Sequence, residues 1–142
     1  MDPSSSRNCA TPAGRLQSIC NRSQLAQGPL GWPEEALGGF VHAAVYAERA
    51  GFDGIQLQAA HGHLLNQFLS AGTNRRRDRY GGDIQNRIRL ISQIREAISR
   101  QVAVDFIVGI KINTMELQAS AFQPNEARFL QLEFERHGKN LS

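Results

Sequence analysis

The chain has 142 residues, a formal net charge of +3 and 41% hydrophobic residues. This length suits one domain, and so mild a positive charge gives no argument for a nucleic-acid partner. No apolar run approaches the roughly 20 residues of a membrane span, and no signal-peptide pattern follows the start. We therefore expect neither a membrane nor a nucleic acid as partner.

Residues 1–31 are rich in serine and arginine and have no apolar period long enough to bury a face. We expect a disordered or leader segment here, followed by the ordered part at residues 32–142. The composition is also compatible with a mitochondrial transit peptide, so the expected compartment is the cytoplasm, with the mitochondrion as the alternative. Cys9 and Cys20 have no partner at metal-ligand spacing, and we expect no metal site.

The first ordered elements are a helix and a strand. Pro33 suits the first turn of a helix, apolar residues recur at helical spacing to Ala47, and Gly51 is a typical C-terminal cap. Residues 53–60 then alternate apolar side chains with Gln56 and Gln58, which predicts a strand. In a parallel barrel, those glutamines would line the interior or its mouth.

The remaining elements alternate in the same way. We expect a short helix at residues 64–69, a polar loop at 70–82, a helix capped by Asp83 with an isoleucine stripe, a strand at 105–113 and a helix at 124–137. Helices that alternate with strands indicate an α/β fold with parallel strands and helical crossovers.

Polar side chains gather where the first strand ends, at Gln58, His61 and His63. Because the carboxyl ends of parallel strands form the active face of such folds, these groups are suited to bind a carbonyl or an anion and to move a proton. The alternative is a pair of surface histidines in a loop. Lys111, near the end of the second strand, either places a positive charge beside a bound anion or extends to solvent.

Four arginines stand close together at Arg75, Arg76, Arg77 and Arg79. No aromatic residues interleave with them to stack on bases, since Tyr80 stands alone. A solvated loop is the preferred interpretation, with a nucleic-acid patch as the alternative.

Several runs resemble the NADH:flavin oxidoreductases, the old yellow enzyme family. They are AGFDGIQLQAAHGHLL at residues 50–65, QFLS at 67–70, TNRRRDRYGG at 73–82, the Asn86-Arg87 pair and VGIKIN at 108–113. The resemblance covers roughly residues 40–134. It implies a TIM barrel that holds FMN at the carboxyl ends of its strands and passes a hydride from NADH or NADPH to an activated alkene or a quinone.

The resemblance also implies roles for four residues. Lys111 matches the basic residue beside the pyrimidine edge of the flavin, and His61 matches one of the two residues that bind the substrate oxygen. Gln58 stands where the family usually has the other, a histidine, and His63 stands where it usually has a tyrosine that donates a proton. We therefore expect Gln58 and His61 to bind substrate, His63 to be catalytic, and the chemistry to be altered.

A (β/α)₈ barrel typically needs about 250 residues. The elements of this chain supply about two strands, so the resemblance implies an incomplete fragment of a barrel that is inactive alone. The alternative is a non-catalytic remnant that associates with another protein chain. Unpaired strand edges also allow self-association.

Overall fold

Two parallel strands with helices packed against them form the part of the chain that a computed structural model describes, residues 28, 31–113 and 122–138. The elements are α1 (Trp32–Arg49), β1 (Gly54–Ala59), α2 (Leu64–Leu69), α3 (Ile84–Ser99), β2 (Ile107–Ile112) and α4 (Pro124–Gly138). The predicted order and types of elements are confirmed. The predictions for most of the N-terminal segment, including both cysteines, lie outside the described residues.

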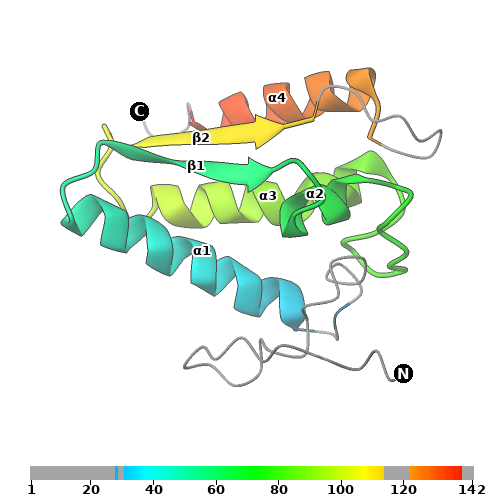
Figure 1. Cartoon of the computed structure of the whole chain (residues 1–142), viewed down its shortest axis with the longest axis horizontal. Helices are drawn as coiled ribbons and strands as arrows, with labels where there is room; N and C mark the ends of the chain where they lie inside the picture. Colours follow the sequence, from blue (N-terminus) through cyan, green and yellow to red (C-terminus); the bar gives the residue numbers. More distant parts are fainter. Residues whose placement is uncertain (1–27, 29–30, 114–121, 139–142) are drawn as a thin grey trace, which may run out of the picture.

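β1 and β2 pair in parallel, with Gly54 opposite Ile107 and Ala59 opposite Ile112. Figure 1 shows both strands pointing the same way, while α1, α3 and α4 run back in the opposite direction. α2 lies at the carboxyl end of β1. This is the repeating strand-and-return-helix arrangement of a (β/α)₈ barrel, of which the described residues supply two strands.

The two faces of the sheet differ in burial. Leu57 and Val108, whose side chains face the helices, are 2% and 7% exposed. The opposite face carries Gln56 and Ile107, which are both exposed. The predicted alternation of β1 is therefore confirmed, and the glutamines occupy the face that the helices leave open.

The helices form one layer, with α3 between α1 and α4. The isoleucine stripe predicted for α3 forms the centre of the core, since Ile91, Ile94 and Ile98 are fully buried. Leu130 and Phe134 of α4 pack against it. Burying a side chain of this size contributes roughly 1.5–3 kcal/mol, so the α3 stripe supplies much of the stability of the described part.

The helix ends match the predictions in position, but the start of α3 is capped by a main-chain group and not by a side chain. Gly51 adopts the left-handed φ of 88° that favours glycine, and the N–H of Phe52 bonds to the carbonyl of Ala47 at 3.1 Å. Asp83 is the N-cap of α3, yet its side chain makes no capping hydrogen bond. Its main-chain carbonyl instead accepts from the N–H groups of Asn86 and Arg87, both at 3.0 Å.

The polar loop between α2 and α3 is held by buried polar groups. Asn74 donates to the carbonyls of Phe68 and Tyr80, at 2.8 and 2.7 Å. The guanidinium of Arg76, of which 6% is exposed, pairs with both carboxylate oxygens of Asp78 and donates to the carbonyl of Gly28. This ion pair holds the pKa of Asp78 below its ordinary value.

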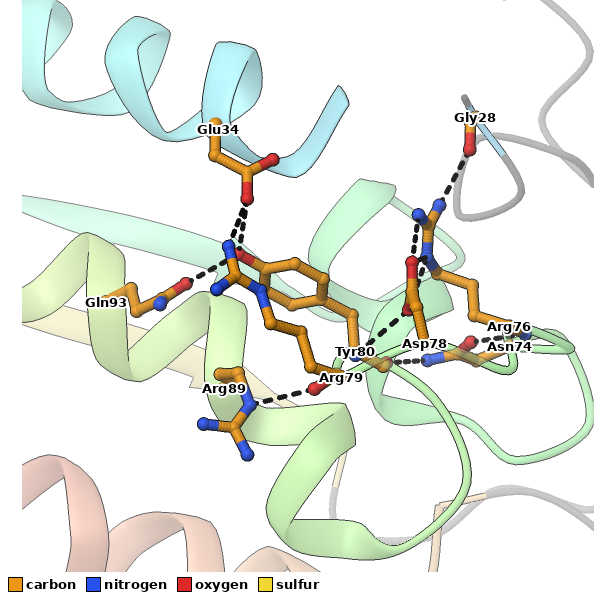
Figure 2. A network of polar contacts seen from close by, with 9 residues as sticks. All are labelled: Gly28, Glu34, Asn74, Arg76, Asp78, Arg79, Tyr80, Arg89 and Gln93. Carbon is orange, nitrogen blue, oxygen red and sulfur yellow. Dashed lines mark hydrogen bonds and ion pairs between the residues drawn. The ribbon is translucent and has the colours of Figure 1, made fainter. Parts of the chain in front are cut away.

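A second group of contacts joins this loop to the helices (Figure 2). The hydroxyl of Tyr80 donates to Glu34 of α1 at 3.1 Å and lies 3.0 Å from the side-chain amide of Gln93 on α3. Arg79 pairs with the same carboxylate at 2.5 Å. Burial, with the neighbouring Glu34, raises the pKa of Tyr80. The loop is therefore an anchored part of the structure.

Arg87, which is buried in α3, contacts the end of α2, the loop before α3 and the first turn of α4. Its guanidinium donates to the carbonyls of Leu69 and Gly82 and pairs with Glu126 of α4. The carboxylate of Glu126 also accepts from the N–H of Gln123 at 3.0 Å, just before α4 begins. Arg87 thus fixes the end of α2 relative to α4 at the carboxyl end of the strands.

Candidate functional site at the carboxyl ends of the strands

Three of the four predicted site residues come together at the ends of β1 and β2. Gln58 is the register partner of Lys111, so both side chains stand next to each other on the open face of the sheet. The side-chain Nε2 of Gln58 lies 3.3 Å from Nδ1 of His61. His61 and Lys111 are exposed, and Gln58 is half-buried.

The turn after β1 positions His61, which has a positive φ of 57°. A residue other than glycine in this conformation costs about 1–2 kcal/mol, so the turn needs other contacts to hold it. Buried Asn66 accepts from the N–H of Gly62, and buried Gln67 donates to the Gly62 carbonyl, both at 2.8 Å. These two side chains belong to α2, so the short helix fixes the turn that precedes it.

Asn113 is a residue of this site that the sequence interpretation missed. It directly follows β2, and its side-chain oxygen accepts from the main-chain N–H of His61 at 3.4 Å. The contact joins the carboxyl ends of both strands. The sequence feature that could have identified Asn113 is its position directly after an apolar strand, at the end of the sheet that also carries Gln58 and His61.

His63 is less closely integrated than the other three. It is the N-cap of α2 and is exposed, and within the described residues no hydrogen bond of its imidazole is recorded. Its main chain is anchored, since its N–H bonds to the carbonyl of Ala60 at 3.2 Å. The side chain is thus accessible for proton transfer, but its catalytic role stays a prediction.

The open face beside this cluster carries no acidic side chain between residues 54 and 59 or between 107 and 112. Gly109 lies on that face two residues before Lys111, so bare backbone adjoins the lysine. One cation, one amide and one imidazole form a set that suits an electron-rich ring or a substrate oxygen. No group of three or more metal-ligating side chains occurs among the described residues.

Most of the arginine-rich segment is exposed, as expected for a solvated loop: Arg75, Arg77 and Arg79 are exposed, and Arg76 is half-buried. Arg76 is paired inside the loop, while Arg79 is 61% exposed and pairs with Glu34. Two of the four cations are therefore committed to internal carboxylates. The expectation that the chain does not bind nucleic acid stays a prediction. Among the described helices, none is long and apolar enough to cross a membrane.

Comparison with known proteins assigns the family. The family described as NADH:flavin oxidoreductase / NADH oxidase matches residues 34–134. The chain belongs to the NADH:flavin oxidoreductase family. Because the matched range contains both strands, the family assignment covers the whole candidate site, and the predicted family is confirmed.

Members of the family are similar in sequence and in structure. The chain is 56% identical over 99 residues to the NADH-dependent flavin oxidoreductase nadA of Aspergillus parasiticus. The aligned region covers 70% of this chain and 22% of nadA. Morphinone reductase in complex with tetrahydroNAD superposes with a TM-score of 0.69 at 32% identity, covering 78% of this chain and 31% of the other. The old yellow enzyme homologue of Zymomonas mobilis superposes with a TM-score of 0.65 at 27% identity, covering 76% and 32%.

These relatives are TIM barrels, which confirms the predicted fold class. The chain spans about a fifth of the length of nadA and less than a third of the two superposed structures. The two strands and their helices therefore correspond to one sector of the family's barrel.

Proposed function

We propose that this chain supplies the substrate-facing sector of an FMN-dependent NAD(P)H oxidoreductase of the old yellow enzyme type. The acceptor would be an activated alkene or a quinone. The observation that carries the proposal is the juxtaposition of Gln58, His61 and Lys111 at the carboxyl ends of two parallel strands. The family assignment and the oxidoreductase names of the relatives support it.

The residues present fit a flavin at this place. Lys111 would lie at the pyrimidine edge of FMN, where a positive charge stabilises the negative charge of a reduced ring. The bare backbone at Gly109 and the lack of acidic side chains on the open face of both strands suit a flat, electron-rich ring. When bound, FMN supplies hydride transfer from NADH or NADPH.

The other side chains would act on the acceptor. Gln58 and His61 would donate hydrogen bonds to the acceptor oxygen, and His63 would donate a proton. An amide at position 58 donates a hydrogen bond but carries no charge. An imidazole at position 63 is a competent acid, yet it is shorter than the family's tyrosine and places its proton differently.

A chimeric enzyme tests this function. Residues 51–113 would replace the equivalent segment of morphinone reductase, and flavin content and alkene reduction would be measured. We expect the chimera to retain FMN and to reduce the alkene about 100-fold more slowly, because correct proton donation typically contributes 10²–10⁴-fold. His63→Tyr in the chimera should recover at least about tenfold of that rate.

Matched variants make the result specific. Lys111→Met should lower the flavin content of the chimera, whereas Lys111→Arg should keep it. Gln56→His, a change on the same strand face two residues before Gln58, should leave the rate unchanged. Equal flavin content and equal rates in the Lys111→Met chimera would show the proposed roles to be wrong.

A second candidate function is association with another protein chain without catalysis. The supporting observation is a set of exposed apolar side chains near the start of the strands: Phe52 is 65% exposed, Val104 80% and Ile107 66%. Apolar side chains gathered in this way often mark an interface. Light scattering after gel filtration would test it, and a monodisperse monomer at high concentration would count against it.

A further inference from the structure

We infer that Gln58 and Asn113 hold His61 as the neutral imidazole tautomer whose proton is on Nε2, which makes Asn113 a positioning residue of the site. This inference rests on the proposed function for its purpose, because an outward N–H is what a carbonyl or phenolate oxygen of the acceptor requires. The position and tautomer of His61 are argued only from the contacts of His61 with Gln58 and Asn113.

The first contact fixes the ring. Nε2 of Gln58 lies 3.3 Å from Nδ1 of His61. An amide nitrogen donates only, so Nδ1 must accept, and the ring proton of the neutral imidazole must then be on Nε2. The two ring nitrogens lie on opposite sides of the imidazole, so the proton on Nε2 is directed away from Gln58. His61 as a whole is exposed.

The orientation of the Gln58 amide has an electrostatic reason. Its register partner on the neighbouring strand is Lys111, whose ammonium group donates and cannot accept. A cation beside the amide favours the carbonyl oxygen on its own side and repels the NH₂ group. The nitrogen is thereby left on the side of His61, which agrees with the recorded contact.

The second contact fixes the backbone that carries the ring. Asn113 accepts from the N–H of His61 at 3.4 Å, and His61 has a positive φ of 57°. Asn66 and Gln67 hold the next peptide group from the side of α2. Because the strained residue is held from β2 as well as from α2, its imidazole reaches the amide of Gln58.

The site then offers the acceptor a definite set of groups. His61 supplies an uncharged N–H donor, and the second N–H of the Gln58 amide supplies another, while the charge of Lys111 would face the flavin. Such a set selects an acceptor with a hydrogen-bond-accepting oxygen, such as an enone carbonyl or a quinone oxygen. It discriminates against an analogue that lacks that oxygen, because the donors would be left unpaired.

The test is nuclear magnetic resonance of the full chain with ¹⁵N-labelled histidine, in which long-range proton–nitrogen couplings report the tautomer of each ring. The spectra are recorded at a pH of about 8.5, well above the ordinary histidine pKa of about 6.5. We expect His61 to have its proton on Nε2 to a greater extent than His63. His63 serves as the internal reference, because no ring partner of it is recorded among the described residues.

Two isosteric substitutions are expected to differ in their effect on the tautomer of His61. Gln58→Glu replaces the donor by an acceptor, so the proton of His61 should move to Nδ1, and the tautomer preference should reverse. Gln56→Glu introduces the same charge on the same strand face but away from the ring, and it should leave the preference unchanged. Asn113→Leu should shift His61 toward the ratio of His63, and Asn113→Asp, which keeps the acceptor, should restore it.

The inference is overturned if Gln58→Glu leaves the tautomer of His61 unchanged, or if Gln56→Glu reverses it equally. A single ratio shared by His42, His61 and His63 in the unmodified chain would also overturn it. None of these readings depends on flavin or on turnover. Failure of the proposed oxidoreductase function is therefore distinguishable from failure of the positioning role.

Discussion

Arg76 shows at the level of a single residue how one member of a charged sequence motif becomes anchored inside the fold. Its guanidinium is buried, pairs with Asp78 and lies 5.9 Å from the ring centroid of Phe68. Arg77, one residue later, is exposed. The run of arginines alone does not distinguish these two positions. The distinction depends on Asp78 two residues after Arg76 and on the carbonyl of Gly28, 48 residues away.

We predict that Arg76→Ala destabilises the chain by about 3 kcal/mol, because it leaves the Asp78 carboxylate without its partner in a partly buried position. Arg77→Ala is the matched control and should change the free energy of unfolding by no more than about 0.5 kcal/mol. Urea denaturation followed by circular dichroism measures both. Equal midpoints for the two variants would contradict a stabilising role of the Arg76–Asp78 ion pair.

The same ion pair makes stability depend on pH in a defined direction. The hydrogen bonds from Arg76 lower the pKa of Asp78 from its ordinary 3.8 in the folded chain. A lowered folded pKa contributes stability that is present above the unfolded pKa and is lost as the pH falls through the folded pKa.

We therefore predict that Asp78→Asn flattens the acid side of the stability profile. Below a pH of about 4, the unmodified chain should lose stability more steeply than the variant does, because only the unmodified chain has this carboxylate to protonate. Free energies of unfolding measured between about pH 2 and 7 test this prediction, because that range lies on both sides of the ordinary carboxyl pKa of about 4. Parallel profiles would indicate that another carboxylate dominates.

At the scale of elements, the sequence predicted the positions of helices and strands better than it predicted individual side-chain contacts. The bounds of α2 agree with the prediction at both ends, and β1 and β2 lie within the predicted strands. Periodicity and glycine positions were sufficient there, because burial on one face follows from local spacing. Asp83 was placed correctly as a cap, but its main-chain carbonyl replaces the predicted side-chain bond, which spacing does not reveal.

The two strands also contain a pair of glycines in contrasting environments. A Cβ on Gly54 would lie 2.4 Å from the main-chain oxygen of Ile107, so β1 approaches β2 where only glycine fits. A Cβ on Gly109 would meet nothing closer than 3.7 Å. One glycine is therefore required by strand packing, and the other is compatible with a side chain.

Gly54→Ala should destabilise the chain by about 2 kcal/mol, since overpacking against backbone typically costs 1–3 kcal/mol. Gly109→Ala should cost less than about 1 kcal/mol or stabilise the chain slightly, because alanine loses less backbone entropy on folding. Thermal unfolding of both variants compares them directly. A larger loss for the Gly109 variant would mean that the strands do not pair in this register.

For the whole molecule, the sequence identified the family and the barrel sector, yet the site geometry needed tertiary information. Gln58 and Lys111 are 53 positions apart in the sequence and become neighbours only through the register of β1 and β2. The contact of His61 with Gln58 depends further on a positive φ at a residue other than glycine. Asn113 joins the site for the same reason, since sequence spacing does not encode which strand end meets the turn.

The described sector also sets an expectation for flavin binding by the 142-residue chain alone. A dissociation constant of about 1 µM corresponds to about 8 kcal/mol. The sector offers one exposed lysine and two uncharged donors, and hydrogen bonds to charged groups contribute roughly 1.5–3 kcal/mol each before the cost of association. These contributions do not reach the affinity that keeps FMN bound through purification.

We therefore predict that the purified chain is colourless and does not saturably quench the fluorescence of about 1 µM FMN, a concentration at which about 8 kcal/mol of binding energy would be required. Lys111→Met should behave in the same way, because Lys111 is exposed and an exposed cation contributes little. Complete morphinone reductase, titrated under the same conditions, is the positive control. A yellow chain with one tightly bound FMN would mean that the sector, alone or assembled with further copies, encloses the flavin, and quenching lost on dilution would identify assembly as the cause.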